Sequence, residues 1–195
     1  MLVKAIFTNS SGILASRIMG FLRDMAMASI LGANIYSDIF FVAFKIPNLF
    51  RTVFAEGAFT QAFIPAFSRS SQKVRFTTMI FSQLLFVLMI LSILVTIFSY
   101  AITSIIAVGF DEKAIDMASP LVAINFYYLP LIFCVTFLGA ILQYKNHFST
   151  TAYSTALLNL AMIISLYLAQ GLHESEIVYY LSFGVLAGGV LQVVT

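Results

Sequence analysis

Seven charged side chains fall inside the first two long apolar stretches of the chain, where charge is costly: Arg17, Arg23, Asp24, Asp38, Lys45, Arg51 and Glu56. Each charge at the centre of a bilayer costs at least about 2.5–3.5 kcal/mol, so such residues face partners or a water-filled cavity. Arginine stays protonated and offers a planar fork that can bind phosphate through two hydrogen bonds. The chemistry that these residues favour is therefore the binding of an anion.

The elements that carry these charges are predicted to be membrane helices. Of 195 residues, 61% are hydrophobic and 9% are charged, whereas a soluble domain carries about 25% charged residues. This composition argues against a soluble enzyme and against a nucleic-acid partner. The single Cys134 excludes a disulfide scaffold. We expect an all-α, polytopic membrane protein, and without a metal, P-loop or nucleophile motif we expect no cofactor, metal site or enzymatic activity.

Runs without charge predict six transmembrane helices, since about 20 apolar residues cross the hydrocarbon core. Gly32-Ala33-Asn34 is a turn signal between the first two. Because the sequence stops at the end of the sixth expected span, we expect residues 1–195 to be either a truncated piece of a longer protein or a half-protein cut at a lobe boundary. The expected spans are about 5–31, 36–66, 77–106, 118–143, 151–171 and 177–195.

Lysine and arginine in the short loops predict the orientation. The loop between the second and third spans holds Arg69, Lys73 and Arg75, the loop between the fourth and fifth holds Lys145, and Lys4 lies near the N-terminus. The loops on the opposite side contain one lysine and five acids. We therefore expect the N-terminus and the basic loops in the cytoplasm, with the chain crossing the membrane several times.

Depth below the outer turn predicts which charges meet. With about 1.5 Å of rise per residue, Asp24 and Lys45 lie at similar depth, and we expect them to pair. Asp38 lies nearest the outer turn and could reach Arg23 only through the long arginine side chain. These acids could close the outer end of a cavity lined by the first two spans, with the other four supporting it from the lipid side.

Arg17 and Arg51 lie level with each other at about 24–27 Å below the outer turn, and they would leave excess positive charge near mid-depth. This pattern favours an anionic substrate, such as a phosphorylated headgroup carried across the membrane. The alternative is a set of structural ion pairs between two helices, because four cations and three acids inside these spans could almost fully pair.

Two motifs carry a family resemblance. The first reads Ser16-Arg-Ile-Met-Gly-Phe-Leu-Arg-Asp24, and the second reads Asp38-Ile-Phe-Phe-Val-Ala-Phe-Lys-Ile-Pro-Asn-Leu-Phe-Arg51. Together they closely resemble the N-terminal signature of the MurJ/MviN family of lipid II flippases, over roughly residues 5–75. The resemblance implies two six-helix bundles in the bacterial cytoplasmic membrane. By alternating access these would move an undecaprenyl-pyrophosphate-linked peptidoglycan precursor from the inner to the outer leaflet.

The resemblance also implies roles for single residues. The substrate-binding positions of the family fall on Arg17, Arg23, Asn48 and Arg51. Its acidic positions fall on Asp24, Asp38 and Glu56, which with Lys45 would form gating ion pairs. Members of the family often carry two consecutive arginines where this chain has Arg51-Thr52, which lowers the local charge and puts one contact in doubt.

Other functions remain open from the sequence. A related flippase for a lipid-linked oligosaccharide would also bind pyrophosphate. A multidrug antiporter for cations should instead expose net acid in its cavity. A non-transporting membrane subunit is an alternative of another class, and it would bind the lipid without moving it. Membrane lipids and the missing second lobe are the other expected partners.

Overall fold

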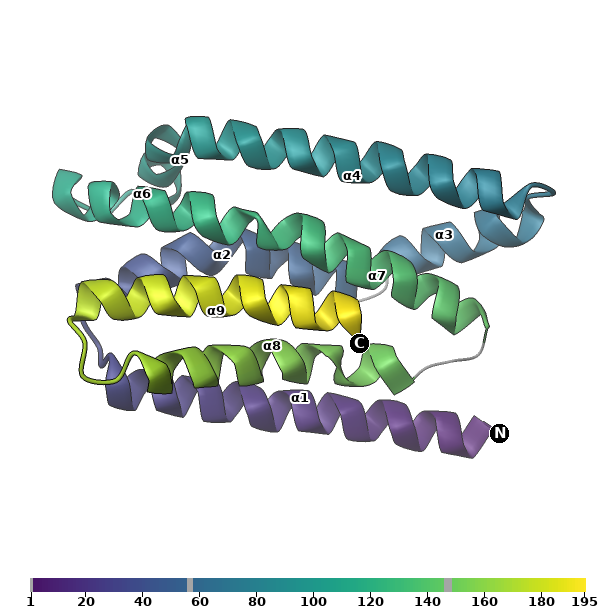
Figure 1. Ribbon diagram of the computed structural model, residues 1–195, viewed down its shortest axis with the longest axis horizontal. Coiled ribbons are helices and arrows are strands. Elements are labelled where there is room, and N and C mark those ends of the chain that lie inside the picture. The colour runs from purple at the N-terminus through teal and green to yellow at the C-terminus, as the bar shows by residue number, and fades with distance from the viewer. Residues whose placement is uncertain (1, 56–57, 146–148) are drawn as a thin grey trace.

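The computed structural model describes residues 2–55, 58–145 and 149–195 (Figure 1). Within these residues the chain is helical and contains no strand, which confirms the all-α prediction. The helices are α1 (Leu2–Ile30), α2 (Ile35–Ala55), α3 (Ala58–Arg69), α4 (Lys73–Ile97), α5 (Ser99–Ile106), α6 (Glu112–Phe126), α7 (Tyr128–Tyr144), α8 (Ser149–Leu168) and α9 (Glu174–Val194).

Three helical stretches of the described chain are long and apolar enough to cross a membrane, judged by length and composition. They are Lys73–Ile97, Glu112–Tyr144 and Glu174–Val194, and a shorter apolar helix covers Tyr153–Leu168. By contrast, α2 carries three charges within its 21 residues. Helices α1 and α2, which carry the charged residues, are not among the stretches that meet this criterion.

Two of the expected spans are broken into two helices, that at 77–106 into α4 and α5 and that at 118–143 into α6 and α7. The expected span at 36–66 covers α2 and α3, and the residues between these two helices lie outside the described ranges. Proline explains the last break. Pro130 has no N–H to donate to the carbonyl of Phe126, so the helix is interrupted at Tyr127, between α6 and α7.

The helices run roughly side by side along the long axis of the molecule (Figure 1). Along one side, α1 packs on α8, and α8 packs on α9. On the other side, α2 packs on α6, α7 and α9, and α4 lies outermost. Helices α1 and α2 follow each other in the chain, yet their described residues make no close backbone contact, and they meet only through side chains near the turn that joins them. The two charged helices thus have different main packing partners.

Two buried clusters hold this arrangement. The larger joins α1, α2, α4, α6, α7, α8 and α9, and it includes Met27, Phe40, Tyr128 and Leu181. Close packing of α9 depends on glycine, because a Cβ atom on Gly188 would lie 2.9 Å from the Leu158 Cδ1 atom. Small residues at helix contacts let backbones approach closely in membrane proteins. The smaller cluster is aromatic and packs α3 against α4 and α7.

Candidate substrate-binding site

Arg23 on α1 is held on two sides. Its Nε and Nη2 atoms donate to the same carboxylate oxygen of Asp24, at 3.0 and 2.7 Å. Its Nη1 atom donates to the side-chain oxygen of Asn159 on α8, at 2.9 Å. The Arg23 side chain is 22% exposed and that of Asp24 is 59% exposed. The guanidinium is therefore fixed in direction but still open to an added ligand.

Arg51 on α2 is positioned by the turn that precedes it. Pro47 lies inside α2 and cannot donate to the carbonyl four residues earlier, which weakens the helix at this point. On the next turn, Arg51 Nε donates to the side-chain oxygen of Asn48 at 3.0 Å. Arg51 is partly buried and lies within electrostatic range of Arg23 and Tyr128. The Pro-Asn pair thus holds one nitrogen of the Arg51 guanidinium in place.

Arg17 and Lys45 are both exposed on their helices. In the described part of the chain, neither makes an ion pair, and the pair of Asp24 with Lys45 that the sequence favoured is not formed. Asp24 pairs with Arg23 instead. The reason is the separation of α1 from α2, which leaves the adjacent arginine as the nearer cation. Glu56 lies outside the described residues.

Asp24 and Asp38 line one pocket of about 550 Å³ at the turn between α1 and α2. Asp38 does not reach Arg23, since that guanidinium is held by Asp24 and by α8. The two carboxylates therefore share a pocket without sharing a cation.

The turn itself is built by two residues. Gly32 adopts a positive φ of 75°, which glycine tolerates. The side-chain oxygen of Asn34 accepts from the backbone N–H groups of Tyr36 and Ser37, at 2.9 and 3.1 Å. These bonds satisfy amides at the start of α2, which otherwise have no helical acceptor. The turn thus fixes where α2 begins relative to α1, and with it the place of Asp38 beside Asp24.

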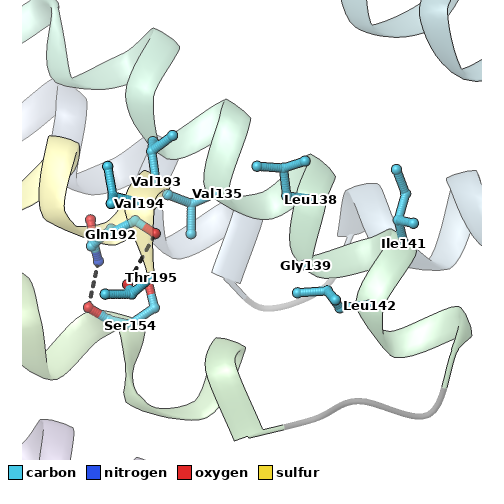
Figure 2. Close-up of a pocket in the computed structure, with 10 residues that line it drawn as sticks. All are labelled: Val135, Leu138, Gly139, Ile141, Leu142, Ser154, Gln192, Val193, Val194 and Thr195. Carbon is cyan, nitrogen blue, oxygen red and sulfur yellow. Dashed lines mark hydrogen bonds between the residues drawn. The ribbon is translucent and has the colours of Figure 1, made fainter.

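Buried polar contacts that the sequence analysis did not single out lie behind the site. Asn125 on α6 donates to Ser182 on α9 at 2.8 Å. Tyr128 donates to Gln192 at 2.9 Å, and Gln192 donates to the backbone oxygen of Ser154 at 2.7 Å. Gln192 and Ser154 also line a pocket of about 260 Å³ among α7, α8 and α9, shown in Figure 2. Since these residues are uncharged and embedded in apolar helices, composition and charge counting gave no signal for them.

Comparison with known proteins gives the family. A family model described as lipid II flippase MurJ matches residues 27–195. The chain belongs to the MurJ family. A "Probable lipid II flippase MurJ" of Helicobacter pylori strain J99 is 52% identical over 167 residues, which cover 86% of this chain and 36% of that protein. A MurJ relative of Rhizobium tropici is 36% identical over 202 residues, which cover 98% of this chain and 38% of the relative.

A solved MurJ structure has the same fold. "Lipid II flippase MurJ, inward closed conformation" superimposes with a TM-score of 0.85 at 27% identity, over 95% of this chain and 40% of that one. The match confirms an all-α membrane fold. The chain spans less than two fifths of the length of the curated MurJ relatives described above.

Proposed function

We propose that this chain is the N-terminal lobe of a lipid II flippase of the bacterial cytoplasmic membrane. The lobe would contain six spans, in which α2 with α3, α4 with α5 and α6 with α7 each form one. Together with a second lobe, it would move undecaprenyl-pyrophosphate-linked peptidoglycan precursor from the inner to the outer leaflet by alternating access. Membership of the MurJ family and the fold of a MurJ structure support this proposal.

One observation carries the assignment of the site. Arg23 is held by Asp24 and Asn159, and Arg51 is held by Asn48, so both guanidinium groups are oriented and both keep N–H groups for a further acceptor. The two positive charges also repel each other, and the one carboxylate of Asp24 offsets part of this charge. An anion between them removes this repulsion, and a pyrophosphate offers enough oxygen atoms for two guanidinium groups. Arg17, exposed on α1, would supply further positive charge, and Asn48 would hold Arg51 in place.

The carboxylates would serve as gating residues. Asp24 occupies one edge of Arg23, so a bound pyrophosphate would compete with it. Asp38 shares the pocket at the outer turn and would gain or lose cationic partners when the lobes move. Lys45, exposed on α2, is the nearest cation on that helix for such an exchange. Glu56 would compete for an arginine nearer the cytoplasm, helping the site to reset.

The proposed orientation places the N-terminus in the cytoplasm. The end of the molecule with Arg69, Lys73 and Arg75 would then lie at the inner surface, as the positive-inside rule requires. There Lys73 Nζ donates to the Tyr144 hydroxyl at 2.9 Å and lies 5.0 Å from the centre of the same ring. This contact joins the start of α4 to the end of α7 at the proposed membrane surface.

The experiment is a transport assay with the full-length gene product in proteoliposomes. Fluorescent lipid II is placed in one leaflet, and its appearance in the other is followed over time. We expect transport of lipid II but not of a fluorescent phospholipid without pyrophosphate, and we expect Arg51→Ala to abolish it. Leu49→Ala, an exposed apolar neighbour on α2, is the matched control. Binding of lipid II without transport would instead identify a binding subunit, and equal transport of both lipids would refute the pyrophosphate site.

A further inference from the structure

Asn159 is a buried amide in a helix without formal charge. The residue is 4% exposed and lies on α8 between Leu158 and Leu160. Burying an amide without hydrogen bonds is costly, so its polar atoms need partners. These partners come from α1, a helix far away in the sequence.

Both ends of the Asn159 side chain bind α1. Its oxygen accepts from Arg23 Nη1 at 2.9 Å, and its nitrogen donates to the backbone oxygen of Ser16 at 3.3 Å. The amide lies over Gly20, where an added Cβ atom would be 3.6 Å from the Asn159 nitrogen. Asn159 thus ties the guanidinium to the backbone of the same helix two turns earlier.

From this geometry we propose that Asn159 is a positioning residue, which orients Arg23 for the pyrophosphate of the substrate. The inference rests on the proposed function and extends the site from α1 and α2 to α8. A guanidinium has five N–H groups. Asp24 and Asn159 together take three of them, which leaves one N–H on each terminal nitrogen for a further acceptor. Without Asn159 the long side chain could turn about its own axis and lose this direction.

A second contact between α1 and α8 makes it possible to test whether Asn159 orients Arg23 or only holds the two helices together. The hydroxyls of Ser11 and Tyr153 lie 2.9 Å apart and join the same two helices without touching Arg23. If Asn159 only held α1 on α8, removing the Tyr153 hydroxyl should resemble removing the amide. If Asn159 orients Arg23, only the amide should matter for the ligand.

The test is a double-mutant cycle on the full-length gene product, with undecaprenyl pyrophosphate as the probe. Affinity and melting temperature are measured for Asn159→Leu, Asn159→Gln and Arg23→Ala. They are also measured for the double variant Arg23→Ala with Asn159→Leu and for the control Tyr153→Phe. We expect Asn159→Leu to weaken binding about tenfold, as loss of a hydrogen bond to a charged group does. In the Arg23→Ala background the same change should have no further effect, and Tyr153→Phe should bind as the wild type does.

Asn159→Gln keeps an amide oxygen as acceptor for Arg23 and an N–H donor for α1, so it should bind more tightly than Asn159→Leu. It also keeps the proposal falsifiable if Asn159→Leu does not fold. Wild-type affinity in Asn159→Leu, or an equal loss in both backgrounds, would overturn the positioning role while leaving the proposed function intact. Wild-type affinity in Arg23→Ala would instead refute the pyrophosphate assignment, and the positioning role with it.

Discussion

Arg51 donates from Nε to the side-chain oxygen of Asn48, one helical turn earlier on α2, at 3.0 Å. The backbone oxygen of Asn48 in turn accepts from the Thr52 hydroxyl at 3.0 Å. The first of these bonds fixes one nitrogen of the guanidinium and leaves the two terminal nitrogens for other acceptors. Asn48, which follows the helix-weakening Pro47, thus orients the guanidinium of Arg51.

The first prediction concerns this bond. Asn48→Leu should weaken the binding of undecaprenyl pyrophosphate by about tenfold, because a hydrogen bond that orients a charged group is lost. Thr52→Val is the control, since it removes the other side-chain hydrogen bond of the turn without touching the guanidinium. Equal losses of affinity in the two variants would show that helix geometry, and not arginine orientation, is what matters.

The second prediction concerns competition for Arg23. Asp24→Asn should strengthen the binding of undecaprenyl pyrophosphate several-fold, because the anion no longer displaces a carboxylate from Nε and Nη2. Asp116→Asn, which removes an exposed carboxylate on α6, is the control for the change in net charge. A weaker affinity of Asp24→Asn would mean that Asp24 prepares Arg23 for the ligand and does not compete with it.

The third prediction concerns the packing of α9 on α8. Gly188→Leu should destabilise the protein by about 1–3 kcal/mol or prevent folding, because overpacking forces helices apart. An added Cβ atom there would already lie 3.0 Å from the Leu158 Cα atom. The melting temperature in detergent measures the effect, with Ala187→Leu at the exposed neighbouring position as control. Identical melting temperatures for the two variants would contradict the packing described above.

The fourth prediction concerns the buried tyrosine. Tyr128→Phe should destabilise the protein by about 1–3 kcal/mol, since the buried Gln192 oxygen loses its donor. Tyr127→Phe removes a hydroxyl that accepts from Thr96 at 3.3 Å in an exposed place, and its effect should be much smaller. Thermal unfolding of both variants tests this difference, which would be absent if the Tyr128 hydroxyl were dispensable.

The sequence was sufficient for the all-α membrane fold and for the choice of α1 and α2 as the charged helices. Charge is so costly in hydrocarbon that its placement is informative by itself. The break between α4 and α5 at Phe98 was missed, because no proline, glycine or charge marks it within the apolar run.

The placement of charge along the sequence did not predict which residues bind these charged side chains. Depth along two neighbouring spans favoured Asp24 with Lys45, but this argument assumed that the two helices pack together. In the structure α1 packs on α8, so Arg23 binds Asn159, an uncharged residue 136 positions away. Such contacts depend on which helices pack together, and the pattern of apolar and charged residues in one sequence does not show which helices do.

The central claim is that Arg17, Arg23 and Arg51 bind the pyrophosphate of the transported lipid. Growth of a strain depleted of its own flippase tests it most directly, with each arginine replaced by alanine in the full-length gene product and expression verified in the membrane. The account predicts that wild-type protein restores growth and that each alanine variant fails to. Normal growth with all three single variants would contradict it.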